Sequence, residues 1–307
     1  MIFFEAGSNP NSRLENRELP EPSNISQHCS SKKPIEIYTF IDPLCPECWA
    51  LEPIVKKLQA EYGHYIKFIY LIGSKLDHLN TFKKKNLGIH RCEDVAIKWE
   101  KTANRTGMSC NGDLWHEDPI STPYIASIAI KAAELQGKKA GVRFLRKMRE
   151  FLFLAKQNIT REPVIMECAK EAGLDLKEFQ KDLHSEGALR AFQCDLKISC
   201  EMEVEELPTL VFFNERVEDE GLKVTGNYAY NVYVSILTEM LGEAPKTEEP
   251  PPIEEFLKNY KFVATKEISV VYDVTCTEVE REMKKLVLKQ KVERVPVKYG
   301  TFWRYIE

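Results

Sequence analysis

Cys45 and Cys48, separated by two residues, are the side chains of this chain with the clearest chemistry. A thiolate attacks disulfides, and a second cysteine nearby can resolve the mixed disulfide that forms. The pair follows an apolar run at 35–41 and precedes a helical apolar pattern that starts at Trp49. Both sulfurs are therefore predicted at the amino end of a helix, where unpaired N–H groups and the helix dipole stabilise a thiolate. This arrangement predicts thiol–disulfide exchange, with Cys45 attacking and Cys48 resolving.

Glu47 lies between the two cysteines and argues against a strongly oxidising pair. A nearby negative charge disfavours the thiolate form of a cysteine. The alternative interpretation is a thioredoxin scaffold whose cysteines are idle or form half of a metal site. The residues themselves leave the redox and the scaffold interpretations open.

Pro208 is a second indication of a thioredoxin fold, because it opens an apolar run at 207–213. In such folds a cis-proline begins the strand that faces the cysteine pair, and the backbone of the preceding residue can pair with an extended partner. An ordinary trans-proline at the start of a strand is the alternative. The placement of Leu207-Pro208-Thr209 after the helical segment favours the cis form.

Several histidines and cysteines raise the question of zinc. Their spacings match no strong zinc-finger pattern, and isolated residues of these types are usually surface or core residues. The weak candidates are His28 with Cys29, and the spaced set His90, Cys92, Cys110 and His116.

The order of elements predicts an α/β, thioredoxin-like fold with a large helical insertion. A strand at 65–72, which we expect to be buried on both faces, follows the first strand and helix and suggests a right-handed parallel crossover. The pattern is mainly helical over 85–203 and includes an expected helix from Tyr124 to Leu135. The sheet resumes at 207–213 and 222–226, and a helix follows at 230–241. We expect Pro53 to kink the helix after the cysteine pair, and Thr160 to cap a later helix.

The terminal segment predicts a small α+β domain that resembles a winged helix. An apolar segment at 266–272 is ambiguous, and a helix at 278–289 carries a capping box of Thr277 and Glu280. Two strands that meet at Tyr299-Gly300 close the domain. The expected organisation is a flexible arm at 1–33, a thioredoxin-like domain at 34–84 and 204–242, a helical insertion at 85–203, an acidic proline-rich linker at 243–252, and the winged-helix-like domain at 253–307.

Composition narrows the class of protein. The 307 residues carry a net charge of -4 with pI near 6.0, which argues against broad nucleic-acid binding. The terminal helix mixes glutamates with lysines, which favours contact with protein over DNA. No apolar region of a secretory signal and no run long enough to span a bilayer is apparent. Nine scattered cysteines suit reduced thiols, so a cytoplasmic location is expected.

The segment from Phe40 to Pro53, the helical insertion and Leu207-Pro208-Thr209 together resemble the DsbA-like family of thioredoxin folds. Within that family, the chain is most similar to the YjbH/SpxH adaptors of Gram-positive bacteria. The resemblance implies a cytoplasmic adaptor that binds the stress regulator Spx and promotes its degradation by the ClpXP protease, rather than an enzyme.

The resemblance also sets expectations for sites and cofactors. It implies partner contacts beside the cysteine pair and the proline, with the candidates Glu47, Trp49, Leu207, Pro208 and Thr209. Members of the family often have a His- and Cys-rich amino-terminal segment associated with zinc, and here only His28 and Cys29 stand in that region. The expectation is that no cofactor is required and that zinc is a possible ligand. The competing hypothesis is a cytoplasmic thiol–disulfide oxidoreductase that uses Cys45 and Cys48.

Overall fold

The first apolar run forms β1 (Ile35–Ile41), an inner strand of a four-stranded sheet in the computed structural model of the chain. β1 pairs in parallel with β2 (Ile66–Ile72) and antiparallel with β3 (Thr209–Phe213), which pairs antiparallel with β4 (Leu222–Thr225). The predicted parallel crossover and the later return of the chain to the sheet are both confirmed. The structure describes residues 33–73, 92–120, 123–216, 218 and 220–306.

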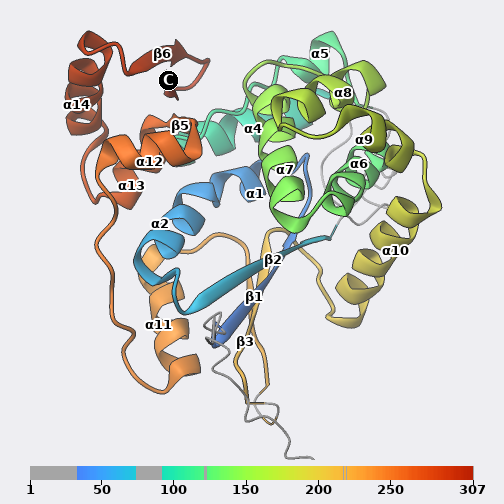
Figure 1. Cartoon of the computed structure of the whole chain (residues 1–307), viewed down its shortest axis with the longest axis horizontal. Coiled ribbons are helices and arrows are strands. Elements are labelled where there is room, and N and C mark those ends of the chain that lie inside the picture. The colour runs from blue at the N-terminus through green and yellow to red at the C-terminus, as the bar shows by residue number, and fades with distance from the viewer. Residues whose placement is uncertain (1–32, 74–91, 121–122, 217, 219, 307) are drawn as a thin grey trace, which may run out of the picture. The chain divides into compact units, whose positions relative to one another are not determined.

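Helices pack on both faces of this sheet (Figure 1). Ile35 and Ile37 of β1 belong to a core that includes side chains of α2 (Glu52–Tyr62) and α11 (Tyr230–Leu241). Phe40, on the opposite face, packs with side chains near the carboxyl end of α10 (Glu186–Glu201). The expectation of a doubly buried strand at 65–72 is wrong. β2 lies at the sheet edge, where Lys67 is exposed and the next residues are only half-buried.

The helix after the cysteine pair is divided into two. α1 (Pro46–Ala50) ends at Leu51, and α2 begins one residue later. Pro53 cannot donate to the carbonyl of Trp49, whereas in the first turn of a new helix its missing N–H is not needed. The predicted kink is therefore a break between two helices.

The described residues between β2 and β3 are mainly helical, as predicted, and the helix expected from Tyr124 to Leu135 is confirmed at both ends. The cap expected at Thr160 is wrong, because the hydroxyl of Thr160 bonds to Asn158 in the preceding turn and Arg161 occupies the cap position. Besides α10, the helices in the described part of this region are α4 (Cys92–Thr106), α5 (Leu114–Glu117), α6 (Tyr124–Leu135), α7 (Lys138–Phe153), α8 (Glu162–Glu171) and α9 (Leu176–Leu183).

The carboxyl-terminal elements have the winged-helix order, helix–strand–helix–helix–strand–strand, which confirms the predicted class. Their antiparallel sheet has the strand order β5-β7-β6. The ambiguous segment at 266–272 is mostly helix, and the short strand before it was not predicted. The elements are α12 (Ile253–Tyr260), β5 (Phe262–Ala264), α13 (Thr265–Val271), α14 (Cys276–Leu288), β6 (Val292–Pro296) and β7 (Thr301–Tyr305).

The capping box of α14 lies two residues earlier than predicted. The hydroxyl of Thr275 accepts from the N–H of Glu278 at 3.2 Å, and the Glu278 carboxylate accepts from the N–H of Thr275 at 2.8 Å. Thr277 and Glu280 have the same spacing, so the sequence offers two equivalent boxes. The structure uses the earlier box, which adds Cys276 and Thr277 to the helix.

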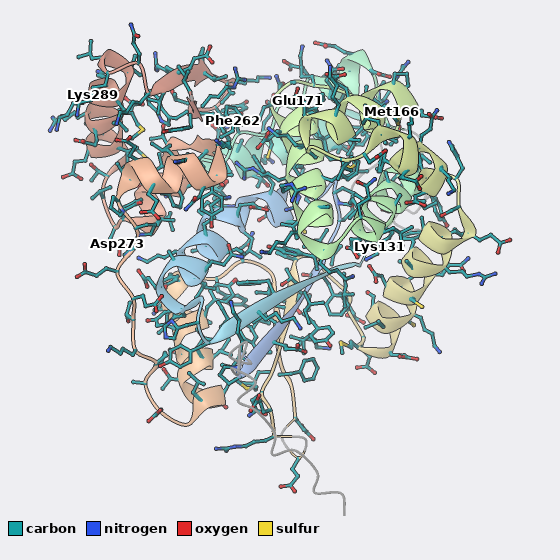
Figure 2. The ribbon with its side chains drawn as sticks, in the orientation of Figure 1. Lys131, Met166, Glu171, Phe262, Asp273 and Lys289 are labelled. Atoms are coloured by element: carbon teal, nitrogen blue, oxygen red, sulfur yellow. The ribbon has the colours of Figure 1, made fainter. Side chains whose placement is uncertain are left out.

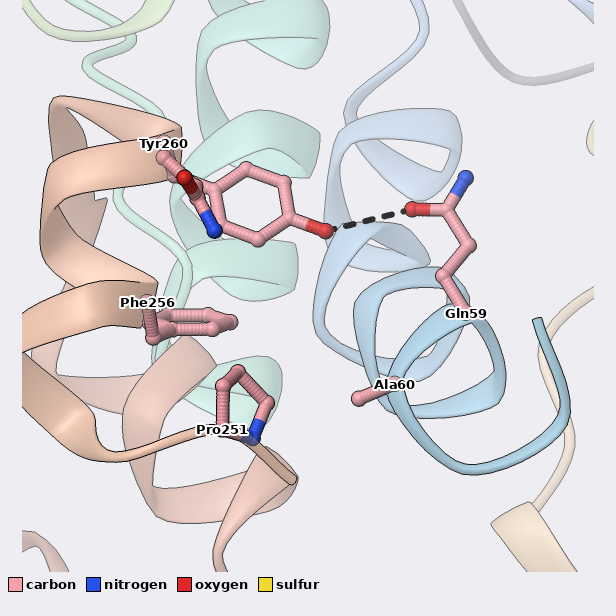
Figure 3. A pocket seen from close by; sticks show the side chains of 6 residues that line it. Gln59, Ala60, Pro251, Phe256 and Tyr260 are labelled. Atoms are coloured by element: carbon pink, nitrogen blue, oxygen red, sulfur yellow. Dashed lines mark hydrogen bonds between the residues drawn. The ribbon is translucent and has the colours of Figure 1, made fainter. Parts of the chain in front are cut away.

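The proline-rich segment before α12 is hydrogen-bonded to α2 and to the residues that follow it. The N–H of Glu248 donates to the carbonyl of Glu61 at 2.9 Å, and the hydroxyls of Tyr62 and Thr247 bond at 3.1 Å. α12 also faces α2 across a cavity of about 270 Å³, where Tyr260 donates to the side chain of Gln59 (Figure 3). The cavity is lined by Gln59, Ala60, Pro251, Phe256, Asn259 and Tyr260.

A charge cluster of Glu52, Lys56, Arg146, Arg149 and Glu267 joins α2, α7 and α13. Glu267 is fully buried, with its carboxylate 2.6 Å from Lys56 Nζ and 2.8 Å from Arg146 Nη1. Burial raises the pKa of Glu267, but Arg146 and Lys56 outweigh burial and lower this pKa to about 2. The chain from Lys33 onward accordingly forms one compact unit.

Candidate functional site

Cys45 is the N-cap residue of α1. Its Sγ accepts a hydrogen bond from the backbone N–H of Cys48 at 3.3 Å and lies 3.7 Å from the carbonyl oxygen of Leu207, to which the thiol donates. Cys45 is half-buried, whereas Cys48 is only 2% exposed. Both are free thiols. The predicted placement of the pair at a helix start, opposite the proline strand, is confirmed.

The two thiols differ in acidity. The pKa of Cys45 is lowered, because hydrogen bonding to the Cys48 side chain outweighs the effect of burial. The pKa of Cys48 is raised well above its ordinary value by burial and by the neighbouring Cys45. An accessible acidic thiol in front of a buried, less acidic one is suited to attack by Cys45 and resolution by Cys48.

Glu47 is held by side chains from two other segments. Its carboxylate accepts from Thr102 at 2.7 Å, from Arg105 at 2.6 Å and from Asn227 at 2.9 Å. Burial raises the pKa of Glu47, but these hydrogen bonds outweigh burial and the pKa lies below its ordinary value. Arg105 compensates the charge of Glu47, and the pKa of Cys45 is lowered although Glu47 lies between the two cysteines.

None of the three partners of Glu47 was identified from the sequence. Thr102 and Arg105 are three residues apart on α4, a spacing that places them on one helix face. Asn227 follows Gly226, whose N–H donates to the carbonyl of Pro208 at 2.7 Å. The spacing of Thr102 and Arg105 on α4 is the one signal that the sequence offers for this site, and it does not identify Glu47 as their partner.

The peptide bond between Leu207 and Pro208 is cis, as predicted. Pro208 and Thr209 are buried, and the hydroxyl of Thr209 donates to the carbonyl of Glu206 at 2.7 Å. Leu207 is half-buried, with its carbonyl beside Cys45 Sγ. Of the three residues predicted here, Leu207 has the most accessible surface beside the cysteine pair.

Trp49 is a core residue. It is fully buried, its indole N–H donates to the carbonyl of Ser109 at 3.1 Å, and the Arg146 guanidinium lies 4.5 Å from the ring centre. Its ring stacks on Phe153 and on Phe302, with centroid distances of 5.8 and 6.2 Å. Trp49 therefore cannot touch a docked partner in this conformation, and its predicted contact role is replaced by a packing role.

The described candidates for a metal site are Cys92, Cys110 and His116. Cys110 is buried, and burial raises the pKa of its thiol well above the ordinary value. Cys92 is half-buried at the start of α4, and His116 is exposed on α5. Among the described residues, no three His, Cys, Asp or Glu side chains are grouped so as to hold a metal. His28, Cys29 and His90 lie outside the described residues, as does most of the predicted arm.

Comparison with known proteins places the chain among thioredoxin folds and adapters. A family model described as Thioredoxin matches residues 38–235. The ClpXP adapter protein SpxH of Halalkalibacterium halodurans is 56% identical over 281 residues, which cover 92% of each chain. The protein of the same name from Bacillus subtilis is 53% identical and covers 90% of this chain and 92% of the relative.

Solved structures agree on the fold. The probable DsbA oxidoreductase of Streptomyces coelicolor superposes with a TM-score of 0.53 at 16% identity, over 70% of this chain and 93% of that one. The cytosolic disulfide reductase DsbM of Pseudomonas aeruginosa gives 0.50 at 17% identity, over 67% and 98%. The DsbA-like architecture predicted from the sequence is confirmed. The described helices include none that is long and apolar enough to cross a bilayer.

Proposed function

The chain belongs to the family of ClpXP adapter proteins, and from that premise we propose that it binds the stress regulator Spx and delivers it to the ClpXP protease. The identity of 56% over 92% of the chain carries this proposal. An adapter of this kind binds two partners and catalyses no reaction itself. The proposal places the protein in the cytoplasm with its protease and needs no cofactor.

We propose that Spx docks on a surface beside the cysteine pair, here called the cysteine-side surface, which is made of Glu47, Arg105, Leu207 and Tyr228. The side chains of Arg105 and Glu47 are 58% and 26% exposed, and Tyr228 is 51% exposed. Arg105 and Glu47 offer a fixed donor and acceptor, and Tyr228 adds aromatic area, which is the mixture that protein interfaces favour. Pro208 and Thr209 support this surface from beneath, because both are buried.

The decisive experiment is degradation of purified Spx by ClpXP with and without this protein. We expect acceleration by the wild-type chain and by the double variant Cys45→Ser, Cys48→Ser, because an adapter needs the fold and not the thiols. A Tyr228→Ala variant tests the surface, and Tyr124→Ala is its matched control, since Tyr124 is also exposed but lies on α6. A wild-type chain that leaves the degradation rate unchanged would refute the proposal.

The lowered pKa of Cys45 favours thiol–disulfide exchange as a second candidate function. The Cys45 thiolate would attack a partner disulfide, forming a mixed disulfide and releasing one partner thiolate. Cys48, after losing its proton, would then attack Cys45 Sγ and release the second partner thiolate, which leaves a Cys45–Cys48 disulfide and a reduced partner. Reduction of a dithionitrobenzoate probe tests this candidate. A rate no faster than that of a free cysteine peptide would exclude it.

A further inference from the structure

α14 has one buried and one outward face. The side chains that pack into the carboxyl-terminal core are Val279, Met283 and Leu286. An α-helix has about 3.6 residues per turn, and this repeat identifies the residues on the side of α14 opposite its buried face. They are Arg281, Lys284, Lys285 and Leu288, and all four are exposed. This outward face therefore carries three cations and ends in a leucine, and one of the cations, Lys285, is paired with Glu282 at 2.6 Å.

Leu288 is the unusual member of the outward face. It is 85% exposed, and its neighbour Val287 is 38% exposed. Figure 2 shows the adjacent Lys289 on the outer side of α14, with its side chain pointing away from the ribbon. Lysines in the last turn of a helix are expected from the helix dipole. That effect fades beyond one turn, so it does not account for Arg281, and it does not account for an exposed leucine.

We propose that the outward face of α14 docks an acidic segment of the delivered substrate, which presents an apolar side chain to Leu288. The assignment rests on the proposed adapter function and names a second contact surface for it. The cations of the outward face favour an acidic partner by charge complementarity. Leu288 supplies an apolar contact that loses its surrounding water when the partner binds. α13, which packs on α14, carries Glu267 of the charge cluster. The outward face is thus held in a fixed relation to the cysteine-side surface.

Several contacts favour a protein partner over nucleic acid. In winged-helix DNA-binding proteins the turn between the last two strands often reaches the DNA. Here Lys298 of that turn is paired with Glu100 at 2.6 Å and Asp113 at 2.7 Å, and the N–H of Tyr299 donates to Ser109. The exposed Leu288 gains nothing from contact with a phosphate backbone.

The test compares two matched double variants of the whole chain, each with one leucine and one lysine replaced by glutamate. Leu288→Glu with Lys284→Glu alters the outward face, and Leu135→Glu with Lys139→Glu alters exposed residues of α6 and α7. All four positions are exposed, so circular dichroism should be unchanged. Binding of purified Spx is measured by titration calorimetry. We expect the α14 pair to raise Kd about tenfold, and the control pair to leave it unchanged.

The outcomes separate the two proposals. If the wild-type chain does not bind Spx, the adapter proposal fails and this assignment fails with it. If the wild type binds and the α14 pair binds equally well, only the assignment to α14 is refuted. Unchanged Spx binding with slower ClpXP degradation would assign the surface to the protease instead. Tight binding of a random DNA duplex that the α14 pair abolishes would overturn the choice of a protein partner.

Discussion

The two cysteines of the pair occupy one helical turn but different environments. Cys45 caps α1 and receives the N–H of Cys48, so its negative charge is met by a donor. Cys48 lies in the core, where burial opposes ionisation. Glu47, which the sequence suggested would weaken Cys45, is instead bound by Arg105 and anchors α1 to α4. The chemistry of the pair thus depends on partners that lie far away in the sequence.

The acidity of Cys45 can be measured by alkylation. Because its pKa is lowered, iodoacetamide should modify Cys45 at a lower pH than it modifies an unfolded peptide of the same local sequence. Cys48 should stay unmodified in the folded chain. Tryptic mass spectrometry across a pH series gives both profiles. The Cys48→Ala variant is the internal check, since losing the side-chain hydrogen bond from residue 48 should move the Cys45 profile to higher pH. Coincident profiles for the chain and the peptide would contradict this prediction.

At the scale of elements, two threonine variants can show which of the two candidate capping boxes begins α14. Thr275→Ala should lower the free energy of unfolding by about 1 kcal/mol, because it removes the acceptor for the N–H of Glu278. Thr277→Ala should change it little, because Thr277 is an exposed residue inside the helix. Urea unfolding of both variants measures the difference. If Thr277→Ala lowered the free energy of unfolding as much as Thr275→Ala or more, Thr277 would be the residue that caps α14.

Elements with a strong local pattern could be predicted from the sequence. β1 and α6 follow unbroken apolar periods, and Pro208 stands next to the strand that it starts. β5 was missed because three residues are too few to establish a period. The partners of Glu47 were missed for another reason. Asn227 lies 180 residues from Glu47, and that contact exists only once the sheet and α4 are assembled.

At the scale of the whole molecule, the charge cluster is the main polar connection between α2, α7 and α13. Glu267 is fully buried, and Arg146 gives it two hydrogen bonds, at 2.8 and 3.0 Å. Removing one partner of a buried ion pair leaves the others uncompensated and commonly costs about 3 kcal/mol or more. Glu267→Gln should therefore destabilise the chain strongly at neutral pH.

This destabilisation should depend on pH. The pKa of Glu267 falls from an ordinary 4.5 to about 2 on folding, so its carboxylate stabilises the fold fully above pH 4.5. That contribution is lost as the pH falls towards 2. The gap in unfolding free energy between the wild type and Glu267→Gln should thus be largest at pH 7 and shrink below pH 4, as urea titrations would measure. Glu186→Gln, at an exposed site, is the control. A gap that stays constant with pH would show that charge is not the cause.

The stacking of Trp49 on Phe302 has a consequence for synthesis of the chain. The same apolar cluster contains Ile41 from the first strand and Phe302 from the last one. A ribosome makes Ile41 and Trp49 long before Phe302, so the nascent chain cannot complete this cluster until β7 has been synthesised. A product that stops before β7 leaves one face of Trp49 uncovered, and exposed apolar surface of that kind is recognised by chaperones and proteases. Synthesis of β7 is therefore a condition for covering Trp49.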